Sequence, residues 1–401
     1  MDVDVEPRTL RIRDNKELEK VLDLKSGFVA ILGRPNVGKS TLLNALIGEK
    51  VAIVTAKPQT TRNRIAGVVE VAARKGVHPA AQIVFVDTPG VHKPGTQLDR
   101  RMLQEVYEAL EACDVVLALM DATRRVQLSA KPSQISESSA GEPGAEVSQV
   151  PESGPGAPKF VELTAQKRPP VWASEDEFLF GLIRKLDCPV FLVLTKIDLV
   201  RKDQLLPMMD ALVKQFAFAQ VIPVSARKRD GLDVLVRKIV DALPKGERYY
   251  PKDQYTDQPL RFMVAELIRE SILIETGEEV PYASAVVIEQ FEEPAPELAP
   301  SPKTGRKPLT RIAAAIYCER DGQKAILIGK GGSKLKEIGS GARRKIESLV
   351  GTRVYLELHV IVEPGWRESK SFIESLDWRN QLEKLAGGQG ADHGRGEEDS
   401  E

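Results

Sequence analysis

The sequence of 401 residues is poor in cysteine, histidine and aromatic residues, and it has no long hydrophobic run. Its three cysteines, Cys113, Cys188 and Cys318, lie far apart in the chain, and its four histidines are scattered. So sparse a set does not suggest a disulfide framework, and without metal-ligand spacing it predicts free thiols and no zinc site. No apolar run approaches the ~18 residues that a membrane-spanning helix needs, so none is expected.

An excess of charge of one sign is also lacking, because 57 Lys and Arg residues face 58 Asp and Glu residues. Any nucleic-acid surface must therefore be a local one. Residues 1–25 alternate acidic and basic side chains without an apolar core, which predicts a charged N-terminal extension rather than a secretory signal. We expect a cytoplasmic monomer. Peripheral contact with the inner face of the cell membrane is left open.

What the chain does have is a series of short, continuous apolar runs that alternate with helical stretches. The runs are residues 28–32, 83–86, 115–120, 190–194 and 221–224. Continuous rather than alternating hydrophobicity predicts strands that are covered on both faces. Residues 26–245 are therefore expected to form an α/β domain, a mostly parallel sheet with helices on both faces. Ligands of such domains bind at the carboxyl ends of the strands.

Two stretches interrupt this pattern. Residues 129–170 contain many Ser, Pro, Gly and Glu residues, which predicts a disordered insertion; a docking segment is the alternative. Residues 292–310 form a second, Pro-rich insertion. Residues 373–401 are expected to be a C-terminal tail whose acidic end is disordered.

After a linker at residues 246–258, the composition changes. Residues 259–372 give the pattern of a helix, two strands, helices broken by glycines, and a closing strand. Such a segment predicts a compact α+β domain of roughly 110 residues.

A phosphate-binding motif follows the first predicted strand. In Gly-x-x-x-x-Gly-Lys-Ser at residues 33–40, the glycines let backbone N–H groups wrap around phosphate, and the next helix offers its positive end. Lys39 is expected at the β- and γ-phosphates and Ser40 at Mg²⁺. The predicted phosphate-binding residues are Gly33, Asn36, Val37, Gly38, Lys39, Ser40 and Thr41.

Two further segments predict the rest of the phosphate site. Asp87, at the end of a strand and about 50 residues after the phosphate loop, is expected to hold Mg²⁺ through water, and Gly90 to sense the γ-phosphate. In the polar stretch 57–64, an exposed loop by composition, a threonine completes the Mg²⁺ shell; Thr61 is favoured over Thr60. Lys39, Thr61 and Gly90 are the candidate catalytic residues.

The nature of the base follows from residues 195–198, Thr-Lys-Ile-Asp. The Asp198 carboxylate can accept two hydrogen bonds from guanine, whereas adenine lacks this donor pair, so Thr195, Lys196 and Asp198 predict guanine binding. Ser225, Ala226 and Arg227 are expected to contact guanine O6 through a backbone N–H.

GTP hydrolysis is expected to be slow. Val91 follows Gly90 at the position where a glutamine could orient the attacking water, and an apolar side chain cannot do so. Asn36 is similar in position to a residue at which some related GTPases hold a K⁺ ion, and this resemblance implies that such an ion could neutralise charge between the β- and γ-phosphates. The alternative is that Asn36 only stabilises the loop.

The second domain contains a Gly-x-x-Gly turn at residues 329–332 between two helical stretches. From Lys324 to Lys345 there are seven Lys or Arg residues and one acidic residue, Glu337. A turn that lets a phosphate backbone approach, flanked by positive charge, predicts RNA binding. The candidate residues are Gly329, Lys330, Gly331, Gly332, Lys334, Lys336, Arg343 and Arg344.

These motifs resemble, in order and spacing, those of the Era-like branch of the translation-factor GTPases. Residues 326–338, 342–347 and 354–357 are similar to the type II KH domain of the Era family. The resemblance implies a GTPase that binds the small ribosomal subunit and its 16S ribosomal RNA during maturation. Two positions depart from the family: Thr195 replaces the usual Asn, and Arg227 replaces Lys or Leu.

Three other functions agree with parts of the sequence. A tRNA-modification GTPase would carry a C-terminal cysteine motif, but Cys318 is expected in mid-strand. A P-loop ATPase or kinase does not explain Asp198. A membrane-associated or cell-cycle signalling GTPase would turn its basic face to lipid, whereas the Gly-x-x-Gly spacing favours RNA.

Overall fold

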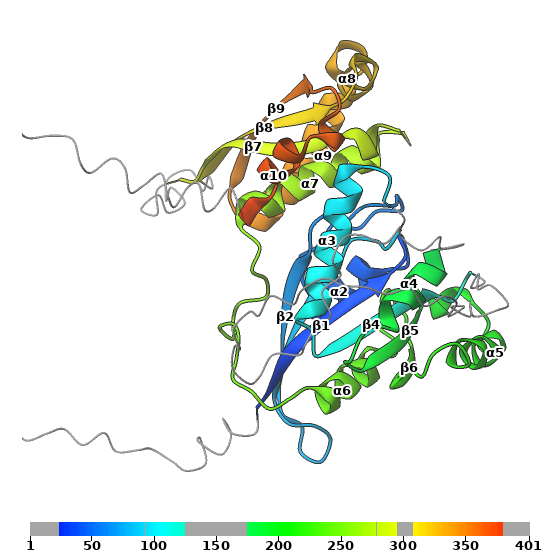
Figure 1. The fold of residues 1–401 in the computed structure, drawn as a ribbon. Helices are drawn as coiled ribbons and strands as arrows, with labels where there is room; N and C mark the ends of the chain where they lie inside the picture. Colours follow the sequence, from blue (N-terminus) through cyan, green and yellow to red (C-terminus); the bar gives the residue numbers. More distant parts are fainter. Residues whose placement is uncertain (1–23, 93, 125–174, 278, 295–307, 380–401) are drawn as a thin grey trace, which may run out of the picture.

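The computed structural model describes residues 24–92, 94–124, 175–277, 279–294 and 308–379, in two domains joined by a connecting segment (Figure 1). The predicted N-terminal extension, the insertion at 129–170, most of the insertion at 292–310 and the acidic end of the tail lie outside the described residues, apart from the last residues of the extension.

The first domain contains a six-stranded sheet in the order β2-β3-β1-β4-β5-β6. The five predicted strands are confirmed and run parallel to one another. The strand β2 was missed, because Gly67 and Glu70 interrupt its apolar residues; it pairs antiparallel with β3 at the sheet edge. The strands are β1 (Lys25–Gly33), β2 (Ile65–Val71), β3 (Ala81–Asp87), β4 (Val115–Asp121), β5 (Val190–Thr195) and β6 (Gln220–Pro223).

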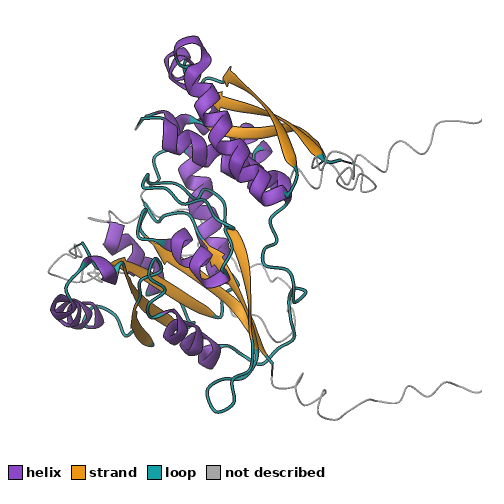
Figure 2. Cartoon of the chain, turned by 180° about the vertical axis from the view of Figure 1, so that it is seen from behind, coloured by secondary structure: helices purple, strands orange, loops and turns teal. Residues whose placement is uncertain are grey.

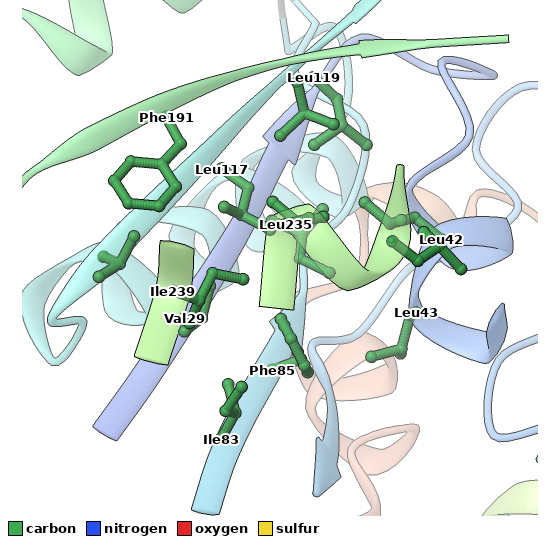
Figure 3. Close-up of a cluster of buried hydrophobic side chains, with 14 of the residues drawn as sticks. Val29, Leu42, Leu43, Ile83, Phe85, Leu117, Leu119, Phe191, Leu235 and Ile239 are labelled. Atoms are coloured by element: carbon green, nitrogen blue, oxygen red, sulfur yellow. The ribbon is translucent and has the colours of Figure 1, made fainter. Parts of the chain in front are cut away.

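Helices cover both faces of this sheet, which explains the continuous apolar runs. In β1, Val29 and Ile31 pack on one face with α2 and α6, as Figure 3 shows for Val29, Leu42 and Leu235, whereas Ala30 and Leu32 pack on the other with α3 and α4. The helices are α2 (Lys39–Ile47), α3 (Gln97–Glu111), α4 (Glu175–Ile183), α5 (Lys202–Val213) and α6 (Leu232–Ala242), with a 3₁₀ turn η1 (Ile197–Leu199).

The second domain packs helices against one face of a three-stranded sheet of order β7-β8-β9 (Figure 2). Ile268, Ile316 and Ile346 lie in its core. The order of elements agrees with the prediction. They are α7 (Leu260–Glu275), η2 (Val280–Ala283), β7 (Ala285–Glu292), β8 (Leu309–Cys318), α8 (Asp321–Ile328), η3 (Lys330–Gly332), α9 (Ser333–Val350), β9 (Arg353–Val362), η4 (Trp366–Glu368) and α10 (Lys370–Ser375).

The segments expected to be peripheral are partly ordered. The linker docks on the edge of the first sheet, where the Val68 N–H donates to the Tyr255 carbonyl at 2.9 Å. The expected boundary at residue 372 falls inside α10, and Trp378 beyond it packs against Phe262. The tail therefore begins later than the composition indicated, because these side chains find apolar partners far away in sequence.

The cysteines differ in two respects from the expectation. Cys113 and Cys188 are neighbours, with free thiols whose sulfur atoms lie 3.8 Å apart. Cys318 is the last residue of β8 rather than a mid-strand residue. Within the described ranges, no three His, Cys, Asp or Glu side chains cluster as metal ligands would, and no helix is long and apolar enough to cross a membrane.

Candidate nucleotide and RNA sites

The phosphate loop connects β1 to α2 and turns at Asn36, whose backbone is left-handed with φ 62°. Lys39 is buried, and its Nζ donates to the carbonyls of Gly33 and Arg34 at 3.1 and 3.0 Å. Burial lowers the pKa of Lys39 to about 8, against the opposing charges of Asp87 and Glu175. A buried cation at the first position of a helix, directly after a glycine-rich loop, is suited to binding an anion.

The predicted magnesium residues converge. Ser40 Oγ donates to Asp87 Oδ2 at 2.7 Å, and Thr61 Oγ1 lies 2.8 Å from Ser40 Oγ and 3.3 Å from the same carboxylate oxygen. Burial raises the pKa of Asp87 to about 6, although Lys39 and the two hydroxyls oppose the shift. The other oxygen, Asp87 Oδ1, is buried without a hydrogen-bond partner among the described residues. An orphaned carboxylate oxygen beside two hydroxyls fits a hard divalent cation.

The geometry distinguishes the two threonines. Thr60 Oγ1 turns away from Asp87 and donates to the Lys57 carbonyl at 2.7 Å, so only Thr61 reaches Ser40. The expectation that this loop is exposed is wrong at one end: Thr61 and Arg62 are only 5% and 8% exposed. Thr61 contacts Ser40 and Asp87, and Arg62 is bound by the chain that follows α7.

A cavity of about 410 Å³ opens between the phosphate loop and residues 53–61. Gly90 lines this cavity. Its backbone lies close to the phosphate loop, because a Cβ atom there would lie 2.8 Å from the ring of Pro35. Of the predicted nucleotide residues, the cavity is lined by Asn36, Gly38, Lys39, Ser40, Thr41, Thr61, Gly90, Lys196 and Arg227.

The predicted base-binding residues are tied to the phosphate loop. The Thr195 hydroxyl donates to the Val37 carbonyl at 2.7 Å, so the residue that departs from the family pattern still reaches this loop. Lys196 Nζ donates to the Asn36 carbonyl at 2.7 Å. The Ser225 hydroxyl donates to Asp198 Oδ1 at 2.6 Å, and this bond lowers the pKa of Asp198.

Asp121 was missed by the sequence reasoning. It lies at the end of β4, and its Oδ2 accepts a hydrogen bond from Lys196 at 2.6 Å. The signal was available, since Asp121 directly follows the apolar run 115–120, where site residues of such sheets are found.

Val91 and Asn36, the two residues behind the expectations about catalysis, both contact other residues of the protein. Val91 packs in the core with Ala30 and Leu32, and its N–H donates to the Gly33 carbonyl at 3.0 Å. Asn36 Nδ2 donates to the Ala56 carbonyl at 2.7 Å, which ties the phosphate loop to the loop opposite.

The predicted RNA-binding turn joins α8 to α9. Gly329 has φ 71°, and a Cβ atom there would lie 2.6 Å from Lys334 Cβ, so the turn requires glycine. Gly331 and Gly332 are left-handed and have open space beside them. The exposed candidate cations are Lys330, Lys336, Arg343 and Arg344.

The basic face is smaller than the count of charges indicated. Lys334 pairs with Glu337 at 2.6 Å, and Lys345 pairs with Glu270 of α7 at 2.8 Å. Counting along one segment could not reveal the acidic partner from another helix.

The fold and the two sites define a class of protein, a P-loop GTPase joined to a KH domain. A family model described as "50S ribosome-binding GTPase" matches residues 28–145, and a KH domain model matches residues 279–367. The GTPase Era of Lacticaseibacillus paracasei is 40% identical over 356 residues, which cover 89% of this chain and 97% of that one. That of Heliobacterium modesticaldum is 39% identical, covering 90% and 99%.

Two solved structures indicate the same family. A variant of Aquifex aeolicus Era bound to GDP·AlF₄⁻ is similar with a TM-score of 0.68 at 34% identity, covering 88% of this chain and 99% of that one. A complex of Era with MgGDPNP and nucleotides 1506–1542 of 16S ribosomal RNA gives 0.69 at 34% identity, with the same coverage. The chain belongs to the Era GTPase family, and it is therefore an enzyme that binds and hydrolyses GTP.

Proposed function

We propose that this GTPase binds small-subunit (16S) ribosomal RNA through its KH domain and assists maturation of the small ribosomal subunit. One observation carries the proposal: the chain is similar over 88% of its length to the Era complex with MgGDPNP and a 16S ribosomal RNA segment. The exposed cations beside the Gly-x-x-Gly turn support it, because they offer phosphate contacts around a backbone that RNA can approach.

In this proposal, GTP occupies the cavity beside the phosphate loop. Lys39 meets the β- and γ-phosphates, while Thr195, Lys196, Asp198 and the segment 225–227 hold guanine. Ser40, Thr61 and Asp87 hold Mg²⁺, which would neutralise phosphate charge. The convergence of these three side chains and the orphaned Asp87 Oδ1 support this ligand set.

Slow intrinsic hydrolysis is part of the proposal, because the buried apolar side chain of Val91 cannot orient a water molecule. Gly90 and Thr61 contribute to hydrolysis by their positions next to the γ-phosphate. A K⁺ ion at Asn36 stays a prediction. Its test is turnover in K⁺ against Na⁺ buffers at equal ionic strength: faster turnover in K⁺ is expected, and equal rates would exclude it.

The RNA assignment is tested with a fragment from the 3′ end of 16S ribosomal RNA in a gel-shift assay. Lys330→Asp and Lys336→Asp are each expected to weaken binding at least tenfold, because they place a negative charge against phosphate. Lys202→Asp, an exposed site on α5 of the GTPase domain, is the matched control. Unchanged binding by both KH variants would contradict the assignment.

Co-sedimentation with small ribosomal subunits in GTP and in GDP tests the switch. We expect more protein to pellet with GTP. A cytoplasmic location accords with this partner, and peripheral membrane contact is tested separately by flotation with anionic vesicles.

A further inference from the structure

The loop that carries Thr61 lies along the KH domain rather than against its own domain alone. Lys50 Nζ pairs with Glu270 of α7 at 2.7 Å, and the Val54 N–H donates to the same carboxylate at 3.2 Å. Farther along the loop, Lys57 Nζ donates to the carbonyls of Thr276 and Gly277, just after α7. The loop is therefore bonded to the KH domain at successive points.

Ile53, in the same loop, belongs to the core of the KH domain. It is 3% exposed and clusters with Val264, Leu267 and Ile268 of α7. The Ile53 side chain therefore comes from the GTPase domain but fills a place in the hydrophobic core of the KH domain. This contact fixes the position of the loop along α7.

On each side of Thr61, an arginine joins the loop to the KH domain. Arg269 of α7 is 3% exposed, is held by both carboxylate oxygens of Glu266 at 2.7 and 2.6 Å, and donates to the Thr60 carbonyl. On the other side, the Arg62 guanidinium enters the KH domain and lies over the Trp366 ring at 5.8 Å.

Arg62 is bound there by main-chain acceptors. It donates to the carbonyls of Ser284, Pro281 and Tyr282 at 2.7, 3.1 and 3.1 Å. Hydrogen bonds from a charged group are stronger than neutral ones, and removing one partner leaves buried groups unsatisfied. The backbone from Thr60 to Arg62 is consequently held from both ends by the second domain.

We propose that Arg269 and Arg62 are positioning residues for GTP binding: with the KH domain, they hold Thr61 toward Ser40 and Asp87 through contacts that the protein itself supplies. The inference rests on the proposed nucleotide site. A loop that is ordered in advance does not have to be ordered by the ligand, so binding costs less. Only GTP benefits, because a switch threonine acts with the γ-phosphate and GDP has none.

The test compares Arg269→Ala with Arg261→Ala in the full chain. Arg261 lies on the same helix and donates to the Ile288 carbonyl at 3.0 Å, within the KH domain, so it is a matched control. For Arg269→Ala we expect the ratio of affinities for a non-hydrolysable GTP analogue and for GDP to fall about tenfold, with GDP affinity unchanged. The Mg²⁺ concentration for half-maximal turnover should rise.

A second variant keeps the proposal testable if Arg269→Ala unfolds the KH domain, as thermal melting would reveal. Arg62→Ala removes the other anchor and should give the same loss of GTP preference. Arg269→Lys retains a donor for the Thr60 carbonyl and should restore part of it. Equal loss of GTP and GDP affinity, or no loss in either arginine variant, would overturn the proposal.

Two reference variants separate this inference from the nucleotide site on which it rests. If Thr61→Ala lowers GTP preference but the arginine variants do not, the site stands and the positioning role is wrong. If Lys39→Ala and Thr61→Ala leave both nucleotide affinities unchanged, the proposed site itself is wrong, and the positioning role falls with it.

Discussion

At the residue scale, two hydroxyl groups hold the residues of the proposed guanine site in place. The Ser225 hydroxyl fixes Asp198, and the Thr195 hydroxyl links the base-binding loop to the phosphate loop. A threonine can therefore replace the asparagine usual in the family, because what this contact needs is a donor for the Val37 carbonyl.

In the proposed nucleotide site, the Asp198 carboxylate is the group that would distinguish guanine from other bases. Asp198→Asn replaces one acceptor oxygen by a donor, which faces the donors of guanine. We expect GTP affinity to fall by about a hundredfold or more. Xanthosine triphosphate, whose 2-oxo group can accept from the new amide, should bind better than GTP. Competition binding with both nucleotides measures this, with Asp210→Asn on α5 as the control; retained guanine preference would refute the role of Asp198.

At the scale of elements, the α8–η3–α9 segment shows how one turn determines the direction of a helix. Gly329 ends α8, and its N–H donates to the Ala325 carbonyl while the chain turns closely past Lys334. Gly351 ends α9 and also has a positive φ, 75°, but its ψ of −5° is left-handed helical whereas that of Gly329 is 176°, and it has nothing within 4 Å of a Cβ position.

These two glycines can be compared, because each ends a helix with a positive φ. Gly351→Ala should cost only the left-handed strain, about 1–2 kcal/mol. Gly329→Ala adds a clash with Lys334 and should cost more, and it should also lower RNA affinity because the turn must move. Thermal unfolding and the gel-shift assay measure the two effects. Equal melting temperatures and equal RNA binding for the two variants would contradict this account of the turn.

At the scale of the whole molecule, residues 377–379, which follow the KH domain, contact helix α3 of the GTPase domain. Glu105 of α3 is fully buried and pairs with Arg101 at 2.8 Å, with Arg64 at 3.6 Å and with Arg379 at 3.1 Å. Asp377 pairs with Arg101 at 2.6 Å. One carboxylate therefore joins α3, the chain after Thr61 and the C-terminal residues.

Removing this carboxylate leaves partly buried arginines without their shared partner. Glu105→Ala is expected to destabilise the protein by about 3–5 kcal/mol. Glu108→Ala, on the same helix but with a side chain that is 30% exposed, should cost about 1 kcal/mol or less. Chemical denaturation of both variants provides the comparison, and similar midpoints would show that Glu105 is not a central link.

Much of the nucleotide site was predictable because its motifs are local. The phosphate loop, Asp87 and residues 195–198 each follow a strand whose apolar run is visible in the sequence, and parallel strands end at the same edge of the sheet. The Gly-x-x-Gly turn was visible for the same reason. Adjacent residues alone specify each of these turns.

The tertiary structure decided what depends on contacts between distant residues. The bond from Arg269 to Thr60 joins positions 209 residues apart, and the pairing of Lys345 with Glu270 crosses two helices. No local pattern contains such pairs. The sequence alone could therefore not show that Thr61 rather than Thr60 reaches Ser40, nor that Asp121, which its place at a strand end could have marked as a site residue, pairs with Lys196. The motifs determined that the chain binds a guanine nucleotide. The packing of α7 against the loop determined how its threonine is held.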